Sequence, residues 1–198
     1  MNYGMLLTDP MLLPAIFAAA VAFGVALLIV LTQEWHGHLS IDSHEGIQKF
    51  HTHPTPRIGG VAIAIGSICA YLISPDSLQE ICGPLLLAGV PAFVLGLAED
   101  ITKRVSVRVR LFATMFCGVL GWAITGYSIT RANVPGLDWM LGFSLVSVAF
   151  TAFAVGGVAN AINIIDGFNG LSAGSTVIIL LGFAGLSLSV GDAQLAYI

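Results

Sequence analysis

The chain has 198 residues, of which 57% are hydrophobic and 9% are charged, and its formal net charge is −4. Soluble domains carry about 25% charged residues, so this composition excludes an ordinary soluble protein, and no basic run suggests nucleic acid as a partner. The composition indicates a polytopic helical protein whose solvent is the lipid bilayer.

The charged residues fall in clusters that leave long uncharged runs between them. Each run is at or near the roughly 20 residues that span a bilayer as a helix. The first Lys or Arg is Lys49, so the first run lacks the basic start of a signal peptide and is read as a spanning helix. The runs cover roughly residues 10–33, 58–75, 81–98, 111–130, 139–165 and 167–191.

We therefore predict an all-α fold, a polytopic transmembrane bundle that forms a single integral-membrane domain over residues 1–198. It has about six spanning helices, and Leu195–Ile198 look like the start of a seventh.

The distribution of Lys and Arg predicts the orientation of these helices. Six of the seven fall in the loops after the first and third helices, and only Arg131 lies in a loop of the other parity. Positive charge collects on the cytoplasmic side, so we expect the N-terminus outside. The cytoplasmic loops are then about residues 34–57, 99–110 and 166–170.

The first polar motif is HTHPTPRIGG, residues 51–60. Its two prolines hold the backbone extended, and Gly59 and Gly60 permit close backbone approach at the start of the second helix. His51 and Arg57 are donors suited to phosphate. The alternative is a stiff loop whose arginine is anchored at lipid headgroups.

The second motif is GLAEDITKRVSVRVR, residues 96–110. Glu99 and Asp100 are adjacent carboxylates at the C-terminal end of the third helix, where the helix dipole is unfavourable for negative charge. Compensation is expected from Lys103 and Arg104, from a bound metal, or from both. The alternative is a surface acid pair that neighbouring bases neutralise.

The third motif is ANAINIIDGFNGL, residues 159–171. Residues three apart on a helix are offset by about 60°, so Asn160, Asn163 and Asp166 are expected to form one polar stripe, while nearby glycines free Asn169 to point elsewhere. Asparagines can also hydrogen-bond between membrane helices. That alternative does not account for a carboxylate in the same stripe.

All three motifs fall on the predicted cytoplasmic side, one after each odd-numbered helix. Acids, amides and bases at one membrane face suit an anionic substrate held with Mg²⁺, an ion that takes oxygen ligands and is usually shared with phosphates. Phosphoryl chemistry is therefore the function class that the residues favour.

The segments HTHPTPRIGG, GLAEDITK and NAINIIDGFNGLSAG, between His51 and Gly174, resemble successive signatures of the polyprenyl-phosphate N-acetylhexosamine-1-phosphate transferases (glycosyltransferase family 4). This group includes GlcNAc-1-phosphate transferases that begin O-antigen, teichoic acid and N-glycan synthesis, and the phospho-MurNAc-pentapeptide transferase of peptidoglycan synthesis.

The resemblance implies a reaction that depends on Mg²⁺, with Mn²⁺ as the alternative ion, in the bacterial inner membrane. A polyprenyl phosphate, with undecaprenyl phosphate as the expected lipid, attacks the β-phosphate of a UDP-N-acetylhexosamine. The products are polyprenyl-pyrophosphate-sugar and UMP. GlcNAc is the favoured sugar, and the oligomeric state is not indicated.

The resemblance also implies roles for individual residues. The catalytic pair is Glu99 and Asp100, placed near the attacking lipid phosphate. Metal ligation falls to Asn163 and Asp166. The substrate-binding residues are His51, Arg57, Lys103, Asn160, Asp166 and Asn169, of which Asp166 and Asn169 match the nucleotide end.

The chain departs from the family pattern in two ways. Glu99 stands where most members have aspartate, and a phosphate monoester is already mostly dianionic at pH 7, so a metal-linked or orienting role is favoured over that of a base. Members also continue through further helices, with an aspartate motif and a histidine-bearing loop. We therefore expect residues 1–198 alone to be an inactive or nearly inactive front part.

Two other function classes remain as alternatives. A transporter or lipid-binding membrane protein would place polar groups near the bilayer midplane and show inverted internal symmetry, whereas the polar residues here cluster at helix ends without a visible repeat. A structural subunit that assembles with a partner is the third class.

Overall fold

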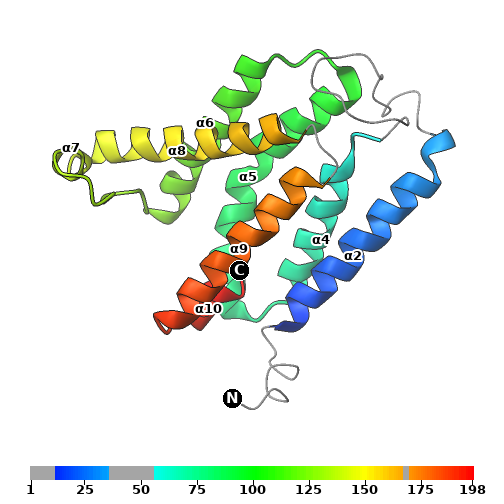
Figure 1. The fold of residues 1–198 in the computed structure, drawn as a ribbon, viewed down its shortest axis with the longest axis horizontal. Coiled ribbons are helices and arrows are strands. Elements are labelled where there is room, and N and C mark those ends of the chain that lie inside the picture. Colours follow the sequence, from blue (N-terminus) through cyan, green and yellow to red (C-terminus); the bar gives the residue numbers. More distant parts are fainter. Residues whose placement is uncertain (1–11, 36–55, 167–169) are drawn as a thin grey trace. The chain divides into compact units, whose positions relative to one another are not determined.

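A computed structural model of the chain describes residues 12–35, 56–166 and 170–198, and every regular element in this part of the chain is a helix (Figure 1). The contacts between residues divide the chain into two compact units. The first unit comprises Met1–Gly83 and Asp166–Ile198, and the second comprises Pro84–Ile165. Each unit is described by itself.

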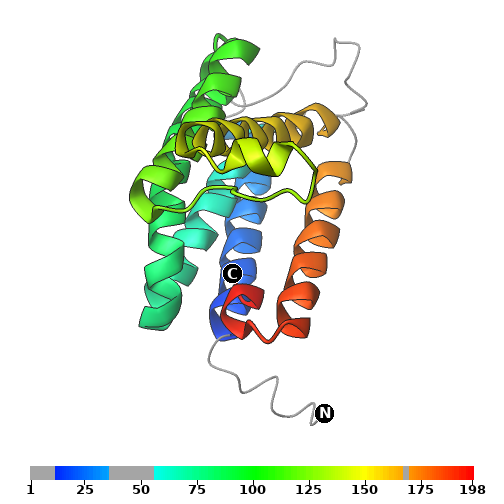
Figure 2. The same cartoon turned by 90° about the vertical axis from the view of Figure 1, so that its left-hand side faces the viewer.

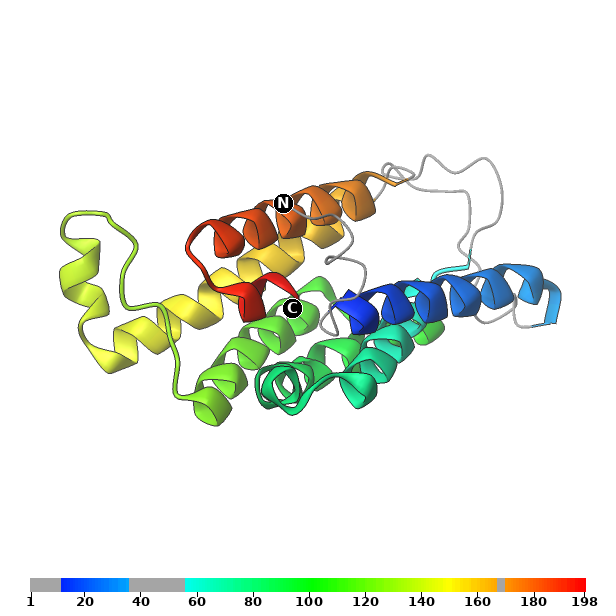
Figure 3. The ribbon, with the colours of Figure 1, turned by 90° about the horizontal axis from the view of Figure 1, so that it is seen from below.

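The first unit contains two helices that lie side by side, α2 (Leu12–Leu31) and α4 (Gly59–Ile73) (Figures 1 and 3). Their close approach depends on small residues. A Cβ atom added at Gly66 would lie 2.8 Å from the carbonyl oxygen of Ala18 and 2.9 Å from the Cβ atom of Ala22. In lipid, such backbone-to-backbone packing replaces the hydrophobic effect as the force that holds helices together.

The helix α4 is shorter than the second predicted span. It has 15 residues, which corresponds to about 22 Å at 1.5 Å per residue, while the hydrocarbon core is about 30 Å thick. Its end is fixed by Ser74, which is extended with ψ at 148°, because the proline that follows disfavours a helical conformation for the residue before it. Its 15 residues are apolar but too few for a straight span.

The next helix, α5 (Asp76–Thr102), is longer than the predicted third span and crosses from the first unit into the second. The prediction began at residue 81 because Asp76 and Glu80 are charged, but an acid in the first turn stabilises a helix N-terminus. Its 27 residues correspond to about 40 Å. This length exceeds the membrane core and allows the acidic C-terminal end to lie outside it.

The first unit ends with α9 (Leu171–Ser189) and α10 (Ala193–Ala196). Gly170 precedes α9 with φ at 77°, a conformation that favours glycine. The short α10 folds back beside the end of α9 (Figure 2), and the Asp192 side chain accepts a hydrogen bond from the backbone N–H of Leu195 at 3.0 Å. The expected start of a seventh helix is thus a single capped turn.

The second unit is built on two antiparallel helices, α6 (Val107–Thr125) and α8 (Ser144–Ile165) (Figure 3). Glycines bring them together. A Cβ atom at Gly118 would lie 2.8 Å from the Cα atom of Ala152, and one at Gly156 would lie 2.5 Å from the Cγ atom of Met115. These two contacts fix the register between the helices.

The structure corrects the predicted fifth span of residues 139–165. Its first residues belong to a separate short helix, α7 (Leu137–Leu141), and α8 begins only at Ser144. The break falls at Gly142, whose backbone N–H caps α7. The sequence did not predict this break, because residues on both sides of it are uncharged and a change of chain direction does not alter hydropathy.

Five helices in the described part of the chain are long and apolar enough to cross a membrane, namely α2, α5, α6, α8 and α9. They expose large apolar side chains such as Phe23 (71%), Ile178 (72%) and Phe153 (65%), which is the surface expected of helices that face lipid. The prediction of an all-α polytopic membrane protein is confirmed. The orientation of the N-terminus stays a prediction.

Candidate functional site

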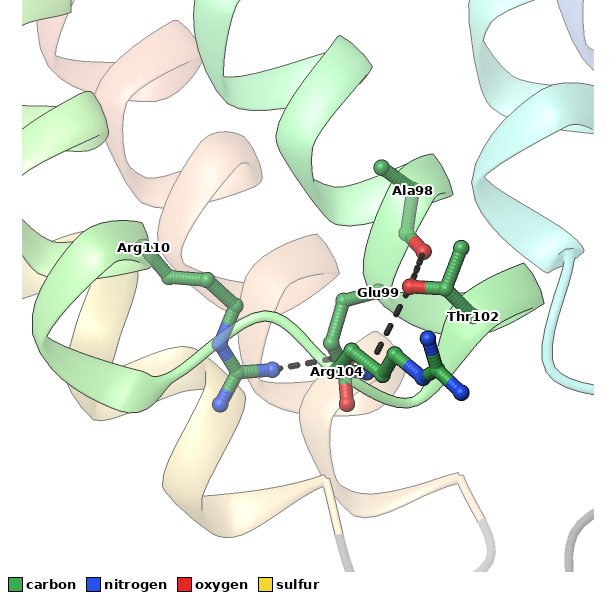
Figure 4. A network of polar contacts seen from close by, with 5 residues as sticks. All are labelled: Ala98, Glu99, Thr102, Arg104 and Arg110. Carbon is green, nitrogen blue, oxygen red and sulfur yellow. Dashed lines mark hydrogen bonds and ion pairs between the residues drawn. The ribbon is translucent and has the colours of Figure 1, made fainter.

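The centre of the second motif is an ion pair between the end of α5 and the start of α6. A guanidinium nitrogen of Arg110 lies 3.0 Å from a carboxylate oxygen of Glu99 (Figure 4). Both side chains are largely shielded, with 24% of Arg110 and 15% of Glu99 exposed. Partial burial lowers the local dielectric, so the pair is held more firmly than a surface ion pair.

A tight turn brings these two side chains together. Lys103 directly follows α5 and has φ at 55°. Its backbone N–H donates to the carbonyl of Glu99 at 2.7 Å. The hydroxyl of Thr102 accepts a hydrogen bond from the backbone N–H of Arg104 at 3.4 Å. Ser106 then caps α6 by accepting from the N–H of the third helical residue at 3.4 Å. The chain therefore reverses within four residues.

The structure adds a partner for Glu99 that the sequence analysis did not name. Compensation of the acid pair was expected from Lys103 and Arg104, from a bound metal, or from both, and Arg110 makes a further salt bridge to Glu99. The spacing could have revealed it, because a serine cap at Ser106 places Arg110 in the first turn of the next helix. The sequence analysis counted Arg110 only among the basic residues of the loop that predict the orientation, and it missed this role.

Asn160 and Asn163 lie on the last two turns of α8, Asn160 half-buried and Asn163 exposed. The antiparallel register of α6 and α8, continued by one turn from Gly156 and Met115, brings Asn160 level with Leu111. Within the second unit, the amides therefore lie at the same end as the pair formed by Glu99 and Arg110.

These amides do not act as a link between helices in the described part of the chain. The structure gives neither Asn160 nor Asn163 a side-chain hydrogen bond to another described residue, whereas Ser128, Ser147 and Thr151 on the same unit are all hydrogen-bonded through their hydroxyls. Within the described residues of the second unit, the asparagines therefore make no side-chain hydrogen bond between helices.

Asp166 differs from its predicted place on a helical stripe. Helix α8 ends at Ile165, and the carboxylate of Asp166 accepts a hydrogen bond from the hydroxyl of Ser172 in the first turn of α9. The stripe on α8 therefore comprises Asn160 and Asn163 alone, while Asp166 is grouped by its contacts with the first unit.

The first motif is described only in part. Arg57 is half-buried and directly precedes Ile58, the N-cap residue of α4. A Cβ atom on Gly59 or Gly60 would meet no described atom within 4 Å. Both lie exposed on the first turn of α4, and the expectation that they permit close backbone approach stays a prediction. The predictions for His51 and Asn169 fall outside the described residues.

The oxygen donors at this end of the second unit have the chemistry of a magnesium site. Carboxylate and amide oxygens are ligands that Mg²⁺ accepts, and the ion usually keeps several waters and shares the rest of its shell with substrate phosphates. No group of three or more His, Cys, Asp or Glu residues in the described segments could hold a metal ion by itself. The donors fit an ion that the substrate helps to bind.

Comparison with known proteins assigns the family. The model of glycosyl transferase family 4 matches residues 83–198, more than half of the chain. The chain belongs to this family. The match begins inside α5 and includes the acid pair, Arg110 and the asparagines of α8.

Individual family 4 relatives agree with this assignment. The chain is 30% identical over 144 residues to a Bacillus subtilis protein named "Probable undecaprenyl-phosphate N-acetylglucosaminyl 1-phosphate transferase", with 73% of the chain and 40% of the relative covered. It is 27% identical over 150 residues to a phospho-N-acetylmuramoyl-pentapeptide-transferase of Clostridium perfringens, covering 72% and 47%.

A third family 4 relative, the undecaprenyl-phosphate alpha-N-acetylglucosaminyl 1-phosphate transferase of Yersinia pestis, is 27% identical over 149 residues, covering 75% of the chain and 40% of the relative. The chain thus spans less than half the length of these curated relatives. No solved structure matches it significantly.

Proposed function

We propose that the chain forms part of a membrane transferase that moves an N-acetylhexosamine 1-phosphate from a UDP-sugar to undecaprenyl phosphate, giving the lipid pyrophosphate sugar and UMP. The site faces the cytoplasm of a bacterial inner membrane. GlcNAc is the proposed sugar, and the product enters cell-envelope glycan synthesis.

The family match over residues 83–198 carries this proposal. The relatives named above belong to two branches with different sugars, yet both names describe transfer of a sugar 1-phosphate or phospho-sugar unit. The geometry supports the same class, because carboxylates, a shielded arginine and amides lie at one end of the second unit.

The residues divide the work by their chemistry. The attacking oxygen belongs to the lipid phosphate, which is mostly dianionic at pH 7, so little remains for a general base. Glu99, held by Arg110 at 3.0 Å, acts as an orienting group together with Asp100. Arg57 and Lys103 neutralise phosphate charge, which is the main contribution a protein makes to phosphoryl transfer.

The bound ion and the nucleotide are assigned to the third motif. Asn163 and Asp166 would hold Mg²⁺ together with the substrate, and His51, Asn160 and Asn169 complete the substrate contacts. When bound, the ion supplies charge neutralisation and orientation of the phosphate oxygens.

The test is sugar-phosphate transfer in membranes that express the gene's full reading frame and, separately, this chain of 198 residues. Labelled UDP-GlcNAc and undecaprenyl phosphate are supplied with Mg²⁺, and then with a chelator. From the full reading frame we expect label in the lipid fraction that disappears on chelation and returns when Mg²⁺ is added back, and from the 198-residue chain alone we expect little or no label.

Matched variants separate the site from general damage. Asn163→Ala should lower the rate about tenfold or more, as loss of a metal or phosphate contact does. Val158→Ala, which truncates an exposed side chain on the same helix, should leave the rate unchanged. Absence of transfer with UDP-GlcNAc would move the proposal to another UDP-sugar, and failure with a panel of such sugars would overturn it.

A further inference from the structure

The segment that joins α6 to α8, residues 126–143, is held in a fixed shape by side-chain hydrogen bonds. The hydroxyl of Ser147 lies 2.7 Å from that of Ser128 and donates to the carbonyl of Ile129 at 2.8 Å. The backbone N–H of Ile129 donates to the hydroxyl of Thr151 at 2.8 Å. Three polar side chains thus fasten the start of the segment to the first two turns of α8.

The second half of the segment is fastened by α7. The carboxylate of Asp138 accepts a hydrogen bond from the backbone N–H of Ala132 at 2.7 Å, and Leu141 is buried with 1% of its surface exposed. The rings of Trp139 and Phe143 meet edge to face with centroids 5.3 Å apart, a favourable geometry for aromatic pairs. Figure 2 shows α7 and the extended stretch before it.

This fixed segment nevertheless presents large apolar side chains outward. Tyr127 is 84% exposed, Trp139 73% and Phe143 55%, and Leu145 at the start of α8 is 82% exposed. Hydrogen bonds that order the backbone and then leave aromatic rings uncovered indicate a surface meant for a non-aqueous partner.

Chain connectivity identifies what lies beside this surface. Helices α6 and α8 are both long and apolar enough to span a membrane, and they are antiparallel (Figure 3). The segment between them therefore emerges at one membrane face. Because Glu99 and Asn160 lie at the other end of the same pair, this face is the one opposite the candidate site.

We propose that residues 126–143 form a membrane-interface anchor that inserts Tyr127, Trp139 and Phe143 at the headgroup level of the leaflet opposite the site. Trp and Tyr favour this zone because one edge of the ring is apolar and the other carries a hydrogen-bonding group. The anchor sets the depth of the second unit, because its hydrogen bonds connect it rigidly to α8. This inference does not depend on the transfer activity.

The test uses the chain reconstituted in phosphatidylcholine vesicles with Trp139 as the only tryptophan, through Trp35→Phe and Trp122→Phe. Phosphatidylcholines brominated near the headgroup should quench Trp139 fluorescence at least twice as strongly as those brominated near the bilayer centre. The matched control is a chain in which all three native tryptophans are replaced by phenylalanine and Phe153→Trp supplies the only tryptophan. Its ring, 65% exposed near the middle of α8, should show the reverse order.

Each other outcome overturns the anchor. Strong iodide quenching without any bromolipid quenching would place Trp139 in water, and strongest quenching from the bilayer centre would place it too deep. Protection from iodide that vanishes when the protein is diluted in lipid would identify a second copy as the partner. If the double substitution reduces helicity by circular dichroism, the quenching difference between the unaltered chain and Trp139→Phe gives the same answer.

Discussion

Glu99 illustrates how a single contact changes the interpretation of a motif. As one of two adjacent acids at a helix C-terminus, it is placed unfavourably with respect to the helix dipole. The guanidinium of Arg110, 3.0 Å away and only 24% exposed, supplies the compensating charge. This ion pair fixes the orientation of the Glu99 carboxylate.

Loss of Arg110 should therefore destabilise the chain. Arg110→Gln is expected to lower the free energy of unfolding in detergent by about 1–3 kcal/mol, because a largely shielded carboxylate loses a charged partner. A double-mutant cycle with Glu99→Gln should recover part of this loss. Arg108→Gln, an exposed change in the same turn, is the control and should alter stability by less than about 0.5 kcal/mol. Strict additivity of the two single changes would argue against the pair.

Lys103 combines a phosphate-binding prediction with an unusual backbone. Its φ of 55° lies in the left-handed region, which costs about 1 kcal/mol for residues other than glycine. We therefore expect Lys103→Gly to be more stable than Lys103→Ala by about 0.5–1 kcal/mol in thermal unfolding. Both variants lack the ammonium group, so both should lose transfer activity alike. Equal stability would show that the turn relaxes.

At the scale of helices, packing depends on which glycines face a neighbour. Gly118 and Gly156 lie against α8 and α6 respectively, whereas a Cβ atom at Gly157 would meet nothing within 4 Å. All three glycines lie inside helices of similar apolar sequence. Which of them contacts the neighbouring helix depends on the register between the two helices.

Replacing these glycines by alanine should give different results. Gly118→Ala is expected to cost about 1–3 kcal/mol of unfolding free energy, since the new methyl group meets backbone atoms of Ala152 that cannot move aside. Gly156→Ala should also destabilise, because its methyl group would lie 2.5 Å from the Cγ atom and 3.3 Å from the backbone nitrogen of Met115. Gly157→Ala should be neutral or stabilise by up to about 1 kcal/mol. Equal effects at Gly118 and Gly157 would contradict the observed packing.

For the whole molecule, the arrangement of Lys and Arg predicts which ends of the helices face the cytoplasm. The prediction can be checked by cysteine labelling in intact cells, with Cys69, Cys82 and Cys117 first replaced by alanine. An impermeant maleimide should label Ala132→Cys directly but label Arg108→Cys only after permeabilisation. The opposite labelling pattern would show that the orientation is the reverse of the predicted one, with the proposed site outside the cell.

Much of the architecture was predictable because hydropathy reports the solvent of each segment. Uncharged runs near residues 10–33, 111–130 and 167–191 correspond to α2, α6 and α9. One error arose where the chain changes direction without a change in composition. At Gly142 an uncharged run contains both the end of α7 and the start of α8. Asp76 caused the opposite error, because a charge at a helix start was taken as the helix boundary.

The sequence by itself determined the class of the protein and the family to which it belongs, because charge scarcity and ordered motifs are properties of the chain alone. Only the tertiary structure identified Arg110 as a partner of Glu99, joined Asp166 to α9 and distinguished Gly118 from Gly157. These features depend on the register and direction of neighbouring helices. Such relations are set by side-chain packing between segments distant in sequence, and no single segment contains them.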